Sequence, residues 1–195
     1  MSNHTLMIMG HVSGELGMAL IAKLFKIDTN IVLVDRKTDP KVSFRSLLKS
    51  TNQNVLTYKL DLSRTSYLKI FMSRVKESFQ TVQTIVLLSD SIPFAEIESF
   101  STHQLQLFYR RNILAFASVI RSGFKSSILN TNTNVILVSD IREGGIISNI
   151  CEAGIEALVK SMKDEIPSIP VVHLRFSQAD SVDNLANQIV GQIGN

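Results

Sequence analysis

The sequence predicts an α/β protein in which helices cover both faces of a doubly wound parallel sheet of about six strands. Two observations lead to this fold class. Apolar runs of roughly four to six residues alternate with longer segments of helical periodicity along the whole chain. Most of these runs are apolar throughout, as in strands that are buried on both faces. Connections of helix length between such strands form right-handed crossovers, which leave the strands parallel within one sheet.

The first half of the chain supplies four of the strands and three helices. The apolar runs place the strands at Leu6–Met9, Ile31–Val34, Val55–Leu60 and Thr84–Leu88. Apolar side chains recur every three or four positions between them, which is the spacing of one helix face. This periodicity predicts helices over Met18–Phe25 and Tyr67–Phe79, and a shorter, weaker one over Lys41–Ser50.

The second half continues the same alternation to the end of the chain. It predicts a long helix over about Thr102–Ser122, a strand at Val135–Val138, a helix at Ile150–Ile166, a strand at Val171–Phe176 and a closing helix at Val182–Ile193. Ser101 or Thr102 is suited to cap the first of these helices, and Asp180 or Ser181 the last, because their side-chain oxygens accept from unpaired N–H groups. No linker, repeat or low-complexity segment interrupts the series, so residues 1–195 form a single domain.

Composition excludes several classes of protein. The chain is 45% hydrophobic and 19% charged, its net charge is only +3, and its basic residues are scattered rather than gathered in the stripe of a nucleic-acid binder. No apolar run has the length of a membrane span, and Cys151 has no second cysteine for a disulfide, so we expect a cytoplasmic protein. We expect Cys151 to be a buried structural thiol. The histidines lack the spacing of metal ligands, so no metal site is expected, and all are expected at the surface or at strand ends: His4, His11, His103 and His173.

A glycine-containing turn joins the first strand to the first helix. Gly10, Gly14 and Gly17 follow the apolar run directly and precede the helical pattern. Such a turn lets backbone N–H groups approach a pyrophosphate, which the helix N-terminus also favours. The spacing is irregular for a dinucleotide site, so a plain strand-to-helix turn is the alternative.

Charged residues close the second and third strands, where parallel sheets bind ligands. Asp35 is placed to accept from the ribose hydroxyls of NAD, whereas Arg36 and Lys37 are placed to pair with the 2′-phosphate of NADP. The alternative is that Asp35 only begins a polar turn. The Asp61-Leu62 pair ends the third strand, where the carboxylate can accept from an adenine amino group or cap the following helix.

The order of elements and several motifs resemble the short-chain dehydrogenase/reductase family. The three glycines match its glycine loop with one residue too many between the last two, and Asp61-Leu62 matches its adenine-contacting pair. Asn112 fits its active-site asparagine, residues 136–139 resemble the strand that delivers the catalytic Ser139, and residues 153–165 resemble the helix after its Tyr-x3-Lys motif. The resemblance extends from Leu6 to about Phe176 and implies a Rossmann-like fold with NAD or NADP as cofactor. Residues 87–90 read Leu-Leu-Ser-Asp and preserve none of the family's Asn-Asn-Ala-Gly.

The same register places Ser148 and Glu152 where the family has its tyrosine and lysine. A serine hydroxyl is a far weaker acid than a phenol, whose pKa is about 10. A carboxylate in place of the lysine opposes a neighbouring oxyanion rather than stabilising it. Standard catalysis is therefore not expected, and Asn112, Ser139, Ser148 and Glu152 are vestigial candidates for a catalytic site.

Two further departures concern the end of the chain and its assembly. Residues 177–180 replace the family's Pro-Gly turn, and the short remainder predicts a shortened substrate region. Helices 102–122 and 146–166 are apolar around much of their circumference, which predicts a homodimer, since the resemblance places a four-helix interface there. The alternative is that the two helices cover each other within one subunit.

Three functions stay open at this stage. The first is a non-catalytic protein that binds NAD or NADP as a regulatory or assembly subunit. The second is an active oxidoreductase with atypical catalytic residues. The third is a purely structural subunit, with a protein partner, whose nucleotide pocket has decayed. The sequence does not distinguish NAD from NADP, and it identifies no substrate.

Overall fold

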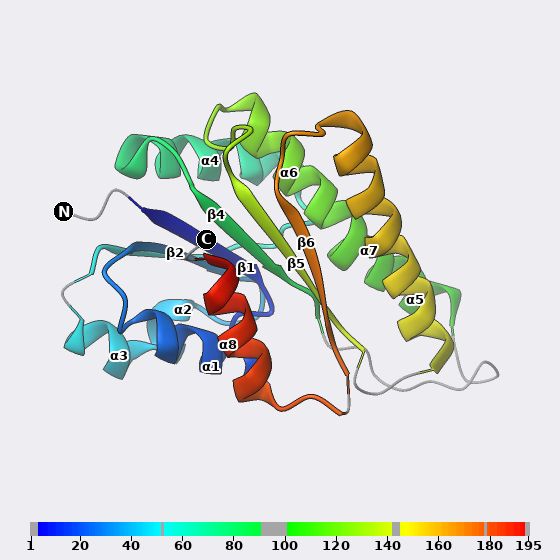
Figure 1. The fold of residues 1–195 in the computed structure, drawn as a ribbon, viewed down its shortest axis with the longest axis horizontal. Coiled ribbons are helices and arrows are strands. Elements are labelled where there is room, and N and C mark those ends of the chain that lie inside the picture. Colours follow the sequence, from blue (N-terminus) through cyan, green and yellow to red (C-terminus); the bar gives the residue numbers. More distant parts are fainter. Residues whose placement is uncertain (1–3, 52, 91–100, 142–144, 178, 194–195) are drawn as a thin grey trace.

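A computed structural model describes residues 4–51, 53–90, 101–141, 145–177 and 179–193, without the side chains of residues 145–147. Its sheet has six strands in the order β3-β2-β1-β4-β5-β6, and every neighbouring pair is parallel. This confirms the predicted fold class (Figure 1). The strands are β1 Thr5–Gly10, β2 Asn30–Asp35, β3 Val55–Lys59, β4 Thr84–Leu88, β5 Asn134–Asp140 and β6 Val171–Phe176.

Helices cover the two faces of the sheet in separate layers (Figure 1). One layer contains α1 Glu15–Leu24, α2 Pro40–Ser43, α3 Arg45–Ser50 and α8 Val182–Ile193. The other contains α4 Thr65–Phe79, α5 Thr102–Tyr109, a π-helical turn η2 at Arg110–Leu114, α6 Ala115–Lys125 and α7 Gly145–Glu165. Because side chains alternate along a strand, Leu6 and Ile8 pack in the first layer's core and Met7 and Met9 in the second's.

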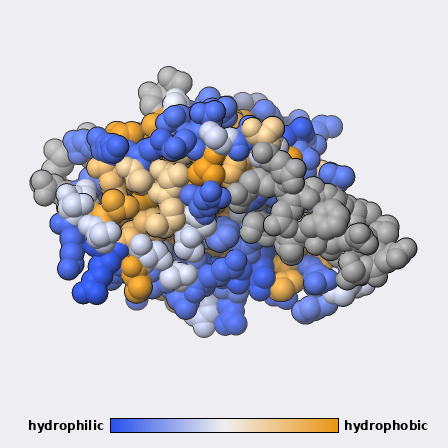
Figure 2. All heavy atoms as spheres, turned by 90° about the horizontal axis from the view of Figure 1, so that it is seen from below, coloured by the Kyte–Doolittle hydropathy of each residue, from blue (hydrophilic) through white to orange (hydrophobic). Residues whose placement is uncertain are grey.

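The outer surface of the first layer is mostly hydrophilic, and a group of hydrophobic side chains lies left of centre in this view (Figure 2). Among its described residues, Met18, Ile27 and Val42 are large hydrophobic side chains that remain exposed. Exposed apolar side chains are normal for a globular protein and mark no binding site by themselves.

Local capping signals account for the start of two helices. Ser101 caps α5 by accepting from the Gln104 N–H, and the Gln104 side chain accepts in return from the Ser101 N–H. Ser181 Oγ accepts from the Asn184 N–H at the start of α8. The predicted cap residues Ser101 and Ser181 are therefore confirmed.

Three predicted helices differ in detail. The segment expected as one helix over 102–122 extends to Lys125 and is interrupted by the π turn η2. Within this turn, the Asn112 side chain donates to the Phe108 carbonyl, competing with the regular backbone pattern. The expected helix over 41–50 is divided at Phe44, and α7 begins at Gly145 rather than at Ile150.

The topology places one crevice at the carboxyl edge of the sheet. β1 lies between β2 and β4. The chain passes from β1 to β2 and β3 on one side of β1, and then crosses to β4 on its other side. Such a reversal opens a space between neighbouring loops, and doubly wound sheets bind their ligands there. The site must therefore be sought beside the ends of β1 and β4.

Candidate functional site

The turn from β1 to α1 requires glycine at two positions for steric reasons. Gly10 has a φ of +112°, and a Cβ added there would lie 2.0 Å from the Leu88 carbonyl oxygen of β4. A Cβ added at Gly17 would lie 2.2 Å from the Val12 carbonyl oxygen. Gly14 precedes α1 directly, and the His11 ring lies over it. The turn therefore packs closely on β4 and on itself at the N-terminus of α1, where an anion is favoured.

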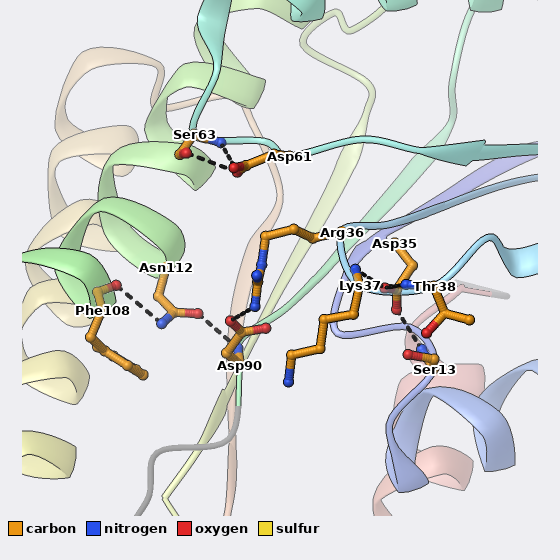
Figure 3. Close-up of polar contacts among 10 residues, drawn as sticks. All are labelled: Ser13, Asp35, Arg36, Lys37, Thr38, Asp61, Ser63, Asp90, Phe108 and Asn112. Carbon is orange, nitrogen blue, oxygen red and sulfur yellow. Dashed lines mark hydrogen bonds and ion pairs between the residues drawn. The ribbon is translucent and has the colours of Figure 1, made fainter. Parts of the chain in front are cut away.

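The Asp35 carboxylate binds backbone rather than pointing into the crevice. Its side chain is buried, and its Oδ2 accepts from the Ser13 N–H at 2.7 Å (Figure 3). Its Oδ1 accepts from the N–H groups of Lys37 at 2.6 Å and Thr38 at 3.0 Å. Asp35 therefore ties the glycine turn to the turn after β2, which corresponds to the polar-turn alternative. Its predicted contact with a ribose stays a prediction, and three N–H donors already use much of its accepting capacity.

Arg36 and Asp90 form an ion pair across the end of β1. Arg36 Nη2 lies 2.8 Å from Asp90 Oδ2, and the two side chains are 21% and 15% exposed (Figure 3). Asn112 fixes the backbone of Asp90, since its Oδ1 accepts from the Asp90 N–H at 2.7 Å. The Asn112 amide donates in turn to the Phe108 carbonyl at 3.2 Å. The π turn η2 therefore supports the segment that follows β4.

Five predicted site residues meet around this ion pair in one narrow pocket. The cavity measures about 10 Å³, which is roughly the room that one water molecule needs. Asp90 and Arg111 line it although neither was predicted as a site residue. The residues that line it are Gly10, Arg36, Asp61, Leu62, Ser63, Leu88, Asp90, Arg111 and Asn112.

Asp61 lies in this pocket as an ionised acceptor. Burial alone would raise the pKa of its carboxyl, but the hydrogen bonds from Ser63 and the charges of Arg36 and Arg64 outweigh burial and lower that pKa. Its Oδ1 accepts from the Ser63 hydroxyl at 2.8 Å and from the Ser63 N–H at 3.0 Å. No side chain caps the start of α4, so the alternative role of Asp61 as a helix cap is wrong.

A second crevice lies on the other side of the glycine turn. Its cavity measures about 30 Å³, and its walls include the carboxylates of Glu15 and Asp140. His11 also lines it; burial first, and then the charge of Lys37, lower its pKa although nearby aspartates act to raise it. The negative charge of carboxylates beside a helix N-terminus weakens the positive potential that would otherwise attract a pyrophosphate.

Charged groups bind one another around Glu152, the residue that the family resemblance aligns with the lysine. Glu152 forms an ion pair with Arg175 of β6, and Glu156 contacts the same guanidinium. The Glu152 Oε1 lies close to Arg175 Nε but outside hydrogen-bond geometry, so the contact is an ion pair without a hydrogen bond. Ser148, which the resemblance aligns with the tyrosine, is buried with 1% of its surface exposed.

Ser139 has a partner that the sequence did not suggest. Its Oγ lies 2.9 Å from His173 Nε2, and burial first, then Arg175, lower the pKa of that histidine. A neutral imidazole can accept the serine proton. The expectation that His173 lies at the surface or at a strand end is wrong: His173 is partly buried in the middle of β6. The alternation of His173 and Arg175 along one strand was the signal that could have found both.

The other chemical groups fit structural roles. Burial raises the pKa of Cys151 to about 12, as expected for an inert thiol. In the described parts of the chain, no three His, Cys, Asp or Glu side chains gather as a metal ion requires. No helix among the described residues is long and apolar enough to cross a membrane.

Comparisons with known proteins agree with this architecture. Among solved structures, an alcohol dehydrogenase from the archaeon Thermococcus sibiricus, complexed with 5-hydroxy-NADP, superposes with a TM-score of 0.84 at 18% identity, over 98% of this chain and 91% of that one. A metagenomic short-chain oxidoreductase in complex with NADP gives 0.78 at 16% identity, over 100% and 92%. A citronellol catabolism dehydrogenase from Pseudomonas aeruginosa gives 0.77 at 16% identity, over 98% and 87%.

Identities this low show a shared fold alone. Curated protein sequences gave no significant match. The sequence model of the family described as short chain dehydrogenase, however, matches residues 4–146, which is well over half of the chain. This direct sequence match agrees with the crevice beside β1 and β4, the glycine turn and the six-stranded parallel sheet. The protein therefore belongs to the short-chain dehydrogenase family.

Proposed function

We propose that this protein binds NAD or NADP but does not catalyse the family's standard hydride transfer, and that it serves as a regulatory or assembly subunit in the cytoplasm. The observation that carries this proposal is the ion pair of Glu152 with Arg175 in the lysine position. The family's reaction needs a cation there and an acidic phenol one helical turn earlier. This chain supplies a carboxylate and the buried hydroxyl of Ser148 instead.

Charge explains why this arrangement disfavours the standard reaction. A lysine in this position stabilises the anionic form of the proton donor, whereas Glu152 raises the energy of any negative charge nearby. Arg175 neutralises Glu152 but is itself 56% exposed and bound to a second carboxylate, Glu156. Little positive charge is therefore left for an oxyanion at this end of the crevice.

The other end supports nucleotide binding. The glycine turn brings backbone close to the N-terminus of α1, and the pocket beside it offers Asp61 as an ionised acceptor and Arg36 and Arg111 as cations. These groups suit an adenosine with its phosphates. The similar structures from Thermococcus sibiricus and from a metagenome contain NADP-type ligands. Bound nicotinamide cofactor supplies hydride chemistry, whereas the residues named here would hold its adenosine part.

The Ser139–His173 hydrogen bond favours a second candidate, an active oxidoreductase with a different proton carrier. In this alternative, Ser139 relays a proton between the substrate and His173. When an alcohol is oxidised, the substrate hydroxyl proton passes to Ser139 Oγ as the proton of Ser139 passes to His173 Nε2, and carbonyl reduction uses the same two transfers in reverse. Ser139→Ala and His173→Gln would then each abolish turnover and leave nucleotide binding unchanged. A purely structural subunit with a decayed pocket is the remaining alternative.

We also propose the homodimer predicted from the sequence. Ile113 and Gly154 pack closely between the two helical segments within one subunit. Tyr109 and Leu114 are nevertheless 43% and 47% exposed, and Ile150 of α7 is 40% exposed. These three side chains leave apolar surface for a second copy. Leu114→Arg should convert the dimer to a monomer in light scattering, and a wild-type monomer at micromolar concentration would contradict the proposal.

Titration with NADH and NADPH tests the function. We expect either cofactor to raise the melting temperature and to change its own fluorescence on binding, with no oxidation of the bound cofactor across a panel of ketones and aldehydes. As a control, Asp61→Asn should weaken binding of both cofactors, because it removes the ionised acceptor from the pocket. Steady turnover would select the second candidate, and absence of binding at millimolar cofactor would select the structural one.

A further inference from the structure

The Arg36–Asp90 ion pair lies where an adenosine would have to enter. Arg36 directly follows β2 and Asp90 lies two residues beyond β4, with β1 between those strands. β1 ends at Gly10, which has no side chain, so the guanidinium can pass over the strand end to the carboxylate (Figure 3). The remaining cavity of about 10 Å³ holds roughly one water molecule. Charged side chains of the protein itself therefore fill most of the pocket.

The pair is held in place rather than formed by two mobile surface side chains. Both side chains are mostly buried, and the backbone of Asp90 is fixed by the Asn112 amide from the π turn η2. Two other carboxylates lie near Arg36: Asp35 is bound to three backbone N–H groups, and Asp61 accepts from Ser63. Asp90 is thus the carboxylate whose charge the Arg36 guanidinium meets directly.

The charge balance of the pocket depends on Asp90. The lining contains the cations Arg36 and Arg111 and the anions Asp61 and Asp90. Asp61 receives hydrogen bonds from Ser63. Without the Asp90 carboxylate, the pocket would present Arg36 as an anion-binding fork at the end of β2.

We propose that the Asp90 carboxylate occupies, in the ligand-free protein, the place at Arg36 that the ribose 2′-phosphate of an NADP-type nucleotide takes on binding. This inference rests on the proposed nucleotide binding and adds an internal competitor to it. A ligand without that phosphate has to break the ion pair and leaves Arg36 unpaired, which is costly in a mostly buried site. A ligand with the phosphate restores a partner to the guanidinium. Asp90 therefore weakens all nucleotide binding and makes what remains selective for the 2′-phosphate.

Two nearly isosteric variants test the competitor. Asp90→Asn removes the charge and keeps the shape, and should tighten binding of NADPH and of its fragment 2′,5′-ADP on the order of tenfold. Arg36→Gln should weaken both ligands while leaving NADH and 5′-ADP unchanged or tighter. Asp164→Asn is the matched control, because it makes the same change of net charge on the exposed end of α7. Affinities are measured by calorimetry, and circular dichroism checks the fold of each variant.

The outcomes separate this inference from the function on which it rests. If wild type and Asp90→Asn bind NADPH with equal affinity, the competitor is overturned and nucleotide binding stands. The same holds if Asp164→Asn tightens binding as much as Asp90→Asn does, or if Arg36→Gln weakens NADH and NADPH alike. If neither the wild type nor Asp90→Asn binds any of the four ligands, both the competitor and the proposed function are overturned.

Discussion

The two ends of the crevice at the carboxyl edge of the sheet are built differently. At the end formed by β1 to β4, Arg36, Asp61 and Asp90 line a pocket: Ser63 binds Asp61, Asn112 binds the backbone of Asp90, and Asp90 binds Arg36. At the end formed by β5, β6 and α7, Glu152 and Arg175 neutralise each other outside that pocket. Binding and proton transfer thus depend on different elements of this fold, and a chain can lose one set of groups while it keeps the other.

The glycines of the turn are needed for steric reasons, whether or not a ligand binds there. Gly10 and Gly17 are required by carbonyl oxygens of the protein itself, so their presence supports the turn and not by itself a nucleotide. The case for binding at this end depends on the charged side chains of the pocket. The case against standard catalysis at the other end depends on Glu152 and Ser148.

The largest effect is expected from Gly10→Ala. Its positive φ and the 2.0 Å approach of a Cβ to Leu88 should cost about 3 kcal/mol or more of unfolding free energy. Gly191→Ala in the last turn of α8 is the matched control: no atom lies within 4 Å of its added Cβ, and replacing a helical glycine by alanine adds at most about 0.5–1 kcal/mol of stability. Urea denaturation measures both. If Gly10→Ala had the same unfolding free energy as the wild type, the turn would not require glycine at position 10.

Asp35→Asn, at the same end of the crevice, should cause a smaller loss of unfolding free energy. The amide can accept from one side only, so at least one of the Ser13, Lys37 and Thr38 N–H groups loses its acceptor. An unsatisfied buried donor costs about 1–3 kcal/mol of unfolding free energy. Asp39→Asn, at a partly exposed capping position, is the control. If Asp35→Asn left stability intact and only weakened NADH binding, the ribose contact predicted from the sequence would replace the structural role described here.

Arg175→Gln at the other end of the crevice should lower the unfolding free energy by about 1 kcal/mol. The loss is small because water partly screens the exposed guanidinium. The change leaves Glu152, whose side chain is 17% exposed, without its cation. Adding Glu152→Gln should recover most of the loss, since the two effects are coupled. Additive losses in the double variant would show that the pair does not neutralise itself, and that this end of the crevice differs less from the other.

The smallest effect concerns pH. Burial lowers the pKa of His173 from its ordinary value of 6.5, so the unfolded chain binds a proton at a pH where the folded protein does not. The stabilising contribution is present above pH 6.5 and declines as pH falls through the folded pKa. His173→Gln should therefore flatten the fall in unfolding free energy between pH 7.5 and 5.5, whereas His103→Gln, at an exposed position, should not. Parallel pH curves for wild type and His173→Gln would contradict this.

Local patterns were enough for the fold and for half of the site. Apolar runs predicted all six strands, because strands that are buried on both faces carry that signal themselves. Gly10, Arg36 and Asp61 meet in one pocket because each lies at the end of one of three neighbouring parallel strands. The break at Phe44 and the π turn at Arg110–Leu114 carry no such periodic signal.

The partners of the charged residues could not be predicted in the same way. Arg36 and Asp90 are 54 residues apart, and Ser139 and His173 are 34 apart. Such pairs depend on strand order and side-chain direction, which a single sequence leaves open. Asp90 was noted only as a departure from the family's motif, and the structure gives that departure a partner.

Hydrogen exchange with and without NADPH tests most directly whether the two ends are independent. We expect NADPH to slow amide exchange in residues 10–17, 35–38 and 59–63, to leave residues 171–176 unchanged, and to be recovered unoxidised. Protection centred on β6 and α7 together with oxidation of the cofactor would show that the catalytic end is functional. Such a result would contradict the separation of binding from catalysis proposed for this protein.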